Sequence, residues 1–396
     1  YIDAEVTKIA TDGAKGLTVT NAIAENVLTF DASGATGAVS LETADADSVV
    51  TFTGGSAGDT FDIAGAAGAL TTTDVLDGGA GSDTLIVDDA DVSGLTALTK
   101  LTNVSNFEVL QIETQLAGGA SVRLDRVQEG LTSVDVEVAG AGAITIGSEM
   151  TGLNVEFKGM AASGNITIDH TSSSSTSDAV TIDMDLGAAD AISATLIITD
   201  YEVATIAIPD GTLTSAGAGI TMTPTTGGNA TLKITGDSSL TMAASDVITA
   251  DIIDASGMVM AAVTDTGLVM TTETAEASGS GVQITGSNAI DTIYGSAAAD
   301  VISAGTGADT IYGLAGADRV TLGEGNDTVV LTVTGSADTI VDFTIGTSAS
   351  PADQIDISEG EIDATVQLTT GNGTDVTANT AIDFASVANG DAISLT

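Results

Sequence analysis

A nine-residue repeat in the last third of the chain limits its possible folds more than any other feature. Between residues 286 and 330 an aspartate recurs at every ninth position, and a large apolar residue follows each aspartate two positions later. Glycines stand five or two residues before most of these aspartates, where tight turns need backbone freedom. The aspartates are Asp291, Asp300, Asp309, Asp318 and Asp327, and the apolar residues are Ile293, Ile302, Ile311, Val320 and Val329. Short strands alternating with glycine-rich turns at a fixed period predict a solenoid.

The pattern resembles calcium-binding β-rolls, and the resemblance implies that two such repeats make one turn of the solenoid, so aspartates two repeats apart are expected on the same edge. Asp291, Asp309 and Asp327 then lie on one edge, with Asp300 and Asp318 on the other. Carboxylates stacked at the strand spacing repel one another, and a hard cation with several oxygen ligands removes that repulsion. We therefore expect Ca²⁺ in these turns. The alternative is a calcium-free β-helix in which Asp and Gly only shape the turns.

The pattern resembles the Gly-Gly-x-Gly-x-Asp-x-U-x nonapeptide of RTX calcium-binding β-rolls, in which U is a large apolar residue. Residues 78–86 (GGAGSDTLI) match it in full, and residues 54–62 match it with Ala57 in place of the third glycine. These two turns add Asp83 and Asp59 to the predicted calcium ligands. Other repeats depart from the pattern, so some turns are expected to bind weakly or not at all: Ala304 and Leu322 replace the first glycine, and Ser287, Ser296 and Leu314 replace the second.

Two acidic segments follow the repeat, at residues 338–343 (DTIVDF) and 353–358 (DQIDIS). They resemble the segment that closes many RTX rolls. The resemblance implies a terminal calcium site completed by Asp342, Asp353 and Asp356, and Asp338 is a further predicted calcium ligand.

Composition agrees with an all-β fold and narrows the possible partners. The chain has 47 Gly, 3 Pro and no Cys, and it carries 55 acidic against 8 basic residues, a formal charge of -47. Such a charge argues against nucleic-acid binding and against an anionic membrane surface. Without Cys, neither disulfides nor thiolate metal sites are available. We predict a right-handed parallel β-solenoid or β-roll, with no transmembrane segment because no apolar run is long enough.

The order of motifs suggests four segments. We predict an N-terminal β-solenoid segment with two RTX turns over residues 1–94, and a β-rich assembly segment over 95–280. An RTX β-roll is expected over 281–345 and a capping segment over 346–396. Tyr1 stands where an initiator Met would, so we expect a processed product or a fragment.

Catalysis is not expected. His170 is the single histidine of the chain, so the H-E-x-x-H motif of the zinc proteases that carry RTX tails is impossible. A polysaccharide lyase or epimerase on a β-helix is the enzymatic alternative, but such a site needs basic side chains near the substrate carboxylate. Only Arg123 and Arg126 lie close together in the sequence.

Further features resemble the S-layer proteins of Caulobacter-like bacteria. DASG occurs at residues 31–34 and again at 254–257, residues 101–110 read LTNVSNFEVL, and nonapeptides occur both early and late. The resemblance implies type I export, calcium-triggered folding outside the cell and self-assembly into a lattice. It also implies a secreted, extracellular protein at the bacterial cell surface, attached to surface polysaccharide through a part outside this chain. An RTX adhesin or biofilm-matrix protein is the alternative.

Overall fold

The computed structural model describes residues 7–19, 28–43, 49–65, 69–95, 99–137, 142–159, 164–171, 175–185, 191–192, 195–209, 213–215, 219–225, 228–243, 246–271, 281–331, 338–344, 353–356, 368–370, 375–376 and 393–395. The chain divides into two compact units. Unit 1 comprises Tyr1–Ser174 and Asp178–Asp185, and unit 2 comprises Ser175–Ser177 and Leu186–Thr396. The two units are defined by their compactness alone. The four segments predicted from the motifs therefore stay a prediction.

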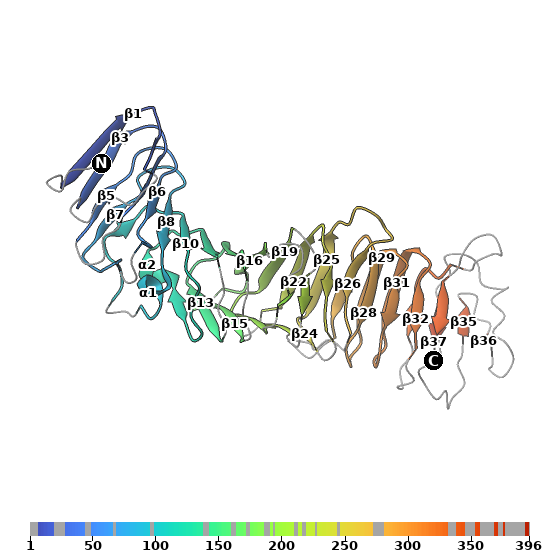
Figure 1. Ribbon diagram of the computed structural model, residues 1–396. Coiled ribbons are helices and arrows are strands. Elements are labelled where there is room, and N and C mark those ends of the chain that lie inside the picture. The colour runs from blue at the N-terminus through green and yellow to red at the C-terminus, as the bar shows by residue number, and fades with distance from the viewer. Residues whose placement is uncertain are drawn as a thin grey trace. The chain divides into compact units, whose positions relative to one another are not determined.

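The predicted parallel β-solenoid is confirmed (Figure 1). In unit 1 the strands form three parallel stacks. The first contains β1 (Lys8–Gly13), β3 (Thr29–Ala35), β5 (Thr51–Thr53), β7 (Val75–Asp77) and β9 (Val104–Ser105). The second contains β2 (Leu17–Thr18), β4 (Val39–Glu42), β6 (Thr60–Asp62), β8 (Thr84–Val87), β10 (Val109–Ile112), β12 (Ser133–Val136), β14 (Leu153–Phe157) and β16 (Ala179–Met184). The third contains β11 (Ser121–Arg123), β13 (Ile144–Ser148) and β15 (Ile166–His170).

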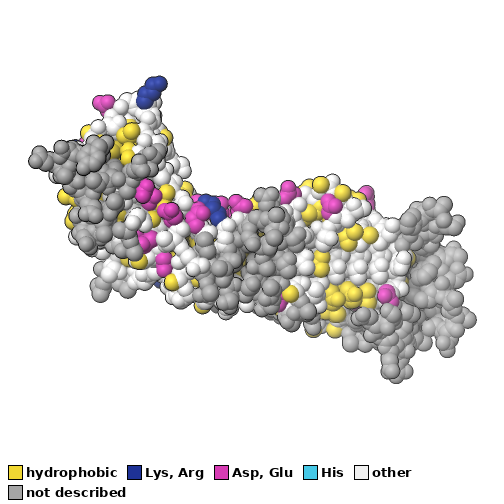
Figure 2. All heavy atoms as spheres, in the orientation of Figure 1, with side chains coloured by type: hydrophobic (Ala, Val, Ile, Leu, Met, Phe, Trp, Pro, Cys, Tyr) yellow, Lys and Arg dark blue, Asp and Glu magenta, His cyan; other side chains and the backbone are white. Residues whose placement is uncertain are grey.

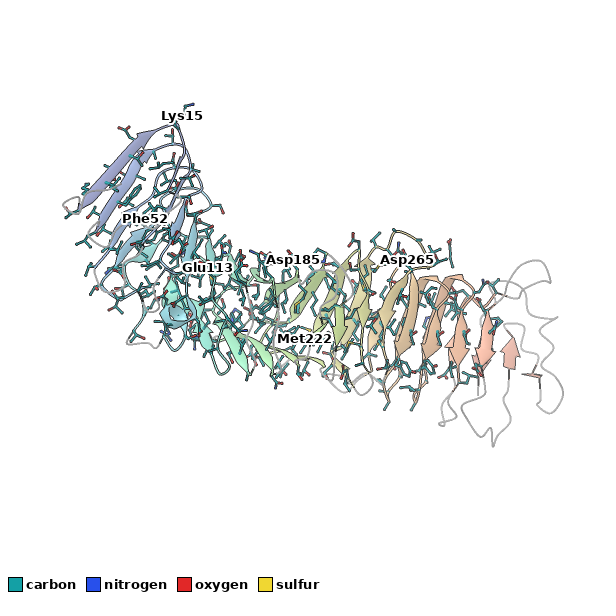
Figure 3. All side chains as sticks on the ribbon, viewed as in Figure 1. Lys15, Phe52, Glu113, Asp185, Met222 and Asp265 are labelled. Carbon is teal, nitrogen blue, oxygen red and sulfur yellow. The ribbon has the colours of Figure 1, made fainter. Side chains whose placement is uncertain are left out.

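The core of unit 1 follows from the alternation of apolar and polar residues along each strand. In β8 and β10, every second residue is buried, as expected when successive side chains point to opposite faces. Phe52, labelled in Figure 3, packs against Phe61 with ring centroids 4.6 Å apart and near-parallel planes. Phe30 and Phe107 flank Phe52 at 6.1 Å and 6.5 Å. Four aromatic rings from three coils therefore pack together inside the solenoid.

Among the described residues, helix is confined to two single turns, α1 (Asp89–Val92) and α2 (Leu124–Val127). Asp88 caps α1, because its side chain accepts a hydrogen bond from Asp91 N–H while the Asp91 side chain accepts one from Asp88 N–H. In the part of the chain that the structure describes, no helix has the length or the apolar character needed to cross a membrane.

Unit 2 changes its cross-section along the chain. Among the described strands, each coil contributes one strand to each of three stacks up to β26 (Thr266–Val269), and from β27 (Gln283–Thr285) onward each coil contributes to only two. One stack contains β17 (Ala191–Ile192), β20 (Leu213–Ser215), β23 (Leu240–Thr241), β26 (Thr266–Val269), β28 (Ile290–Tyr294), β30 (Thr310–Tyr312), β32 (Thr328–Val330) and β34 (Gln354–Asp356). Another contains β19 (Val203–Ile208), β22 (Thr231–Gly236), β25 (Ile252–Met258), β27 (Gln283–Thr285), β29 (Val301–Gly307), β31 (Arg319–Gly325) and β33 (Thr339–Ile340).

The third stack of unit 2 contains β18 (Leu196–Thr199), β21 (Ile220–Thr223) and β24 (Ile248–Thr249). Near the C-terminal end, β35 (Leu368–Thr370), β36 (Asp375–Val376) and β37 (Ile393–Leu395) make antiparallel pairs. In the part of unit 2 with two stacks, Val301 pairs with Arg319 and Thr310 pairs with Thr328. Both pairs span two nonapeptides, which confirms that two repeats make one coil.

The two DASG segments have the same local structure. Each lies at a register shift between neighbouring parallel strands, in β3 and in β25. Asp31 Oδ1 accepts hydrogen bonds from the backbone N–H and the hydroxyl of Ser33 at 3.2 Å and 2.7 Å. Asp254 does the same with Ser256 at 3.1 Å and 2.5 Å. The repeated sequence therefore marks a repeated bulge in the solenoid.

Candidate calcium-binding turns

The aspartates of the predicted nonapeptides lie inside the solenoid, at the points where turns become strands. Asp59 and Asp83 precede β6 and β8, and Asp300, Asp309, Asp318 and Asp327 precede β29 to β32 in order. Asp291 is the second residue of β28. All seven side chains are at most 1% exposed. Because ionised carboxylates are costly to bury, each of them requires a partner of opposite polarity.

One oxygen of each carboxylate finds such a partner in the preceding coil. Asp309 Oδ1 accepts a hydrogen bond from Asp291 N–H at 2.8 Å, and Asp327 Oδ1 accepts one from Asp309 N–H at 2.9 Å. On the other edge, Asp318 Oδ1 accepts from Asp300 N–H at 2.9 Å. These partners are 18 residues apart, so the predicted assignment of aspartates to two edges is confirmed.

Unit 1, where the coils are longer, has an equivalent row of hydrogen bonds between the carboxylates and backbone N–H groups of successive coils. Asp83 Oδ1 accepts a hydrogen bond from Asp59 N–H at 2.6 Å across 24 residues. Glu108 Oε2 accepts from Asp83 N–H at 2.9 Å. The sequence reasoning missed Glu108. Its signal was its position directly before the strand β10, equivalent to that of Asp83 before β8.

The hydrogen bonding of the second carboxylate oxygen, Oδ2, divides the turns into two groups. In Asp59, Asp291 and Asp300, Oδ2 accepts a hydrogen bond from the backbone N–H four residues earlier, each at 2.6 Å. We call these the closed turns. In Asp83, Asp309, Asp318 and Asp327, Oδ2 is buried and has no hydrogen-bond partner. We call these the open turns. A buried carboxylate oxygen without a donor is costly, and a proton, a water molecule or a cation beside it removes that cost.

Burial also makes the ionised form of these carboxylates costly. Burial raises the pKa of Asp309 to about 8, with the carboxylates of Asp291 and Asp327 adding to the effect. Burial likewise raises the pKa of Asp318 to about 7, with nearby Asp338 and Asp300 contributing. Burial is also the largest cause that raises the pKa values of Asp83 and Asp327 to about 6. A divalent cation in the open turns would offset these penalties.

The donor set fits Ca²⁺. Its members are hard oxygens, which suit Ca²⁺ and not the softer transition metals. Among the described residues, no group of three or more acidic, His or Cys side chains could hold a metal by itself. Backbone carbonyls would therefore supply the remaining ligands. A Cβ added at Gly307 would meet Ala289 O, and one added at Gly325 would meet Gly307 O, so carbonyl oxygens of the neighbouring coil do face these turns.

The acidic residues of the predicted terminal site lie farther along the same stacks. Asp338 Oδ1 accepts from Asp318 N–H at 3.0 Å, which extends one edge of the ladder. Asp342 accepts from Leu322 N–H at 2.7 Å and from Gly323 N–H at 3.0 Å. Asp353 accepts from Asp327 N–H and Thr344 N–H at 3.0 Å and 2.6 Å, and Asp356 ends β34. A calcium site shared by Asp342, Asp353 and Asp356, and calcium binding by Asp338, stay predictions.

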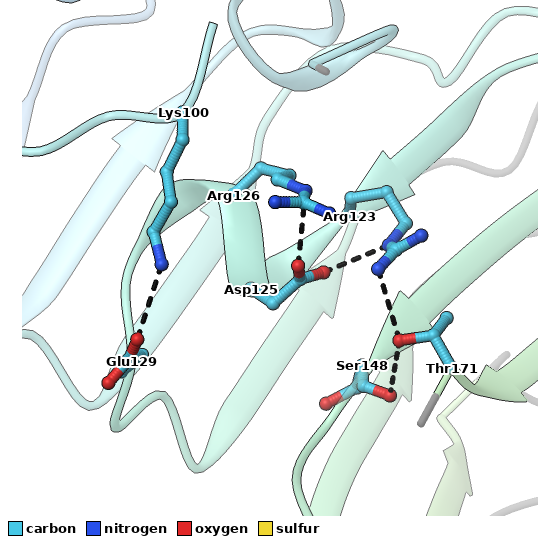
Figure 4. Close-up of polar contacts among 7 residues, drawn as sticks. All are labelled: Lys100, Arg123, Asp125, Arg126, Glu129, Ser148 and Thr171. Atoms are coloured by element: carbon cyan, nitrogen blue, oxygen red, sulfur yellow. Dashed lines mark hydrogen bonds and ion pairs between the residues drawn. The ribbon is translucent and has the colours of Figure 1, made fainter. Parts of the chain in front are cut away.

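The two neighbouring arginines form a structural cluster in unit 1 (Figure 4). Arg123 Nε and Arg126 Nε contact the two oxygens of buried Asp125 at 2.9 Å and 3.1 Å. Arg123 Nη2 also donates to Thr171 Oγ1 at 3.1 Å. Nearby, Lys100 pairs with Glu129 at 3.2 Å. Asp125 therefore already neutralises part of the positive charge that a uronate-binding enzyme would need here.

Comparison with known families identifies the turns. A family model described as the RTX calcium-binding nonapeptide repeat, in 4 copies, matches residues 71–91, 283–307 and 294–329. The chain thus carries RTX repeats, which bind calcium, and the predicted cofactor is confirmed. Neither the curated proteins nor the solved structures gave a match.

Proposed function

We propose that this chain is a structural protein of the bacterial cell surface, which folds on binding Ca²⁺ outside the cell and then assembles into an S-layer lattice. The observation that carries the proposal is the row of buried, unpartnered carboxylate oxygens in turns that match a calcium-binding repeat. RTX proteins are typically secreted, and calcium outside the cell would complete a fold that is incomplete without it.

Surface charge supports calcium-dependent association. The chain has a formal charge of -47, and Figure 2 shows acidic side chains on the described surface of both units, with few basic ones. Copies of such a chain repel one another in solution. Divalent ions that neutralise or bridge acidic faces remove this repulsion, and many small contacts can then hold an array.

An exposed strand offers one contact for such an array. Strand β1 is the end member of its stack and pairs only with β3 among the described strands. Most of its residues are exposed. An edge strand with free backbone groups is a template for pairing with another chain. Pairing through this edge would supply one of the repeated contacts that a lattice requires.

We expect the purified chain to assemble as Ca²⁺ is raised and to disperse when EDTA is added. Light scattering and negative-stain electron microscopy across a Ca²⁺ titration would measure this, with NaCl at matched ionic strength as the control. Sheets or extended arrays in Ca²⁺ alone would support the lattice. A chain that remains monomeric at high concentration with its calcium sites filled would exclude self-assembly and favour an RTX adhesin.

A further inference from the structure

Open and closed turns differ in backbone conformation as well as in hydrogen bonding. The residue four before the aspartate is left-handed in every open turn, with φ +95° at Gly79, +110° at Gly305, +69° at Leu314 and +96° at Gly323. None of the equivalent residues of the closed turns, Gly55, Ser287 and Ser296, is left-handed. A change in the sign of φ reorients the peptide N–H at this position, so the two conformations present different groups to the carboxylate.

The hydrogen bonds of that N–H follow the backbone. In the closed turns it points at the aspartate and donates to Oδ2. In the open turns of Asp83 and Asp327 it donates elsewhere, from Gly79 to Asp77 Oδ1 at 3.1 Å and from Gly323 to Asp342 Oδ2 at 3.0 Å. The closed turn thus supplies its own positive partner for the carboxylate, and the open turn leaves that place to a cation.

Serine strengthens the closure in two of the three closed turns. Ser287 Oγ donates to Asp291 Oδ1 at 2.7 Å, and Ser296 Oγ donates to Asp300 Oδ1 at 2.7 Å. Each serine therefore provides two donors to one carboxylate, through its backbone N–H and its hydroxyl. A cation would have to displace both.

A second position separates the groups in the sequence itself. Two residues before the aspartate, every open turn has a glycine with φ between +136° and +155°, namely Gly81, Gly307, Gly316 and Gly325. Every closed turn has an alanine there: Ala57, Ala289 and Ala298. Alanine is disfavoured at such φ values, and a Cβ at Gly307 or Gly316 would meet the carbonyl oxygen of Ala289 or Ala298 in the preceding coil.

Resting on the calcium-dependent folding proposed above, we propose that only the open turns of Asp83, Asp309, Asp318 and Asp327 hold Ca²⁺. The turns of Asp59, Asp291 and Asp300 close on themselves and fold without metal. In both units a closed turn precedes the first open turn on the same edge, since Asp59 N–H caps Asp83, and Asp291 N–H caps Asp309. Each calcium-loaded run therefore begins on a coil whose conformation does not depend on the ion.

Calcium bound per chain tests the assignment. In equilibrium dialysis of the full chain, Asp309→Asn and Asp318→Asn should each lower the bound calcium, whereas Asp291→Asn and Asp300→Asn should leave it unchanged. Asparagine keeps the Oδ1 acceptor of the ladder, and far-UV circular dichroism at saturating Ca²⁺ would verify folding. Equal losses from open-turn and closed-turn variants, or no calcium bound to the unaltered chain, would overturn the assignment.

Substitutions that open a closed turn give an independent test. Ala57→Gly restores the third motif glycine in a turn whose Gly55 already tolerates a left-handed conformation, and it should add calcium to the chain. Ser287→Gly combined with Ala289→Gly should do the same in unit 2. No gain in either variant would refute the proposal. Bound calcium is measured whether or not the chains associate, so this result is separate from that of the assembly experiment.

Discussion

Asp309 shows at the scale of one residue how a buried carboxylate can serve both the fold and a ligand. Its Oδ1 satisfies the backbone N–H of Asp291, and its Oδ2 has no partner within the described protein. Asp185 provides the contrast, because it lies just past β16 and is exposed to solvent (Figure 3). The two residues have the same chemistry, so burial and hydrogen bonding alone distinguish their roles.

We expect Asp309→Ala to destabilise the calcium-loaded chain and Asp185→Ala to leave it nearly unchanged. Loss of Asp309 leaves the N–H of Asp291 buried without an acceptor, which costs about 1–3 kcal/mol before any loss of bound calcium is counted. An exposed substitution such as Asp185→Ala changes stability by no more than about 0.5 kcal/mol. Melting temperatures in saturating Ca²⁺ would compare them, and equal losses would contradict the role given to Asp309.

At the scale of the element, a stack of turns behaves as a row of coupled carboxylates. Asp309 lies between Asp291 and Asp327, and these neighbours raise its pKa further after burial has raised it. Since the pKa values of Asp309 and Asp318 reach about 8 and about 7, these two carboxyls hold protons near neutral pH when no metal is bound. Calcium needs the ionised form, so protons and calcium compete for the same edges.

This competition predicts opposite pH dependences with and without the ion. Folded-state pKa values above the unfolded ones mean that the metal-free turns are most stable at low pH and lose stability as pH rises toward about 8. Calcium affinity should instead increase over the same range. Circular dichroism of the metal-free chain between about pH 3 and about pH 9 would follow the first effect, because these values lie about one unit outside the ordinary Asp pKa and the folded-state value of about 8.

Titration calorimetry would follow the second effect. At pH about 7, binding heats measured in two buffers of different ionisation enthalpy should differ, because calcium displaces protons from the open turns. The variant Asp185→Asn is the matched control, since it removes a carboxylate from an exposed position. Identical heats in both buffers would show that the turns are already ionised and would contradict the raised pKa values.

At the scale of the whole molecule, the fold repeats one coil with local changes in its cross-section. In a solenoid each coil contacts only its neighbours, so its stability is a sum of short-range terms. Few described basic side chains contact the stacked acids, although Lys158 contacts Asp135, Glu137 and Glu156. With a formal charge of -47, most of the neutralisation must come from ions in solution.

We therefore expect Ca²⁺ to convert the isolated chain from a largely disordered state to a β-rich state. Far-UV circular dichroism in EDTA and in millimolar Ca²⁺ at pH about 7.5 would record the change, with Mg²⁺ as the control because its smaller octahedral shell suits these turns less well. Native-like spectra in EDTA would show that hydrophobic packing alone is sufficient to fold the solenoid.

The sequence by itself determined the repeating unit. The nine-residue spacing of Asp291 to Asp327 predicted the two edges, the two repeats per coil and the ion, because a strict period stacks identical turns above one another. The sequence also shows that glycine stands two residues before Asp309 and alanine two residues before Asp291. The effect of this difference depends on the tertiary structure, because a Cβ at Gly307 would meet the carbonyl oxygen of Ala289 in the neighbouring coil. Outside the repeat, coils of unequal length hid the equivalence of Glu108 and Asp83, which strand pairing made visible.

Tertiary structure revealed which aspartates accept a second hydrogen bond from their own turn. Asp291 and Asp309 occupy the same motif position, and the sequence reasoning assigned both to calcium. The difference arises because Ser287 directs its N–H and hydroxyl at Asp291, whereas left-handed Gly305 precedes Asp309, whose Oδ2 has no donor. Hydrogen bonding depends on the sign of one backbone angle and on the packing of the next coil, and neither is written in the spacing of the motif.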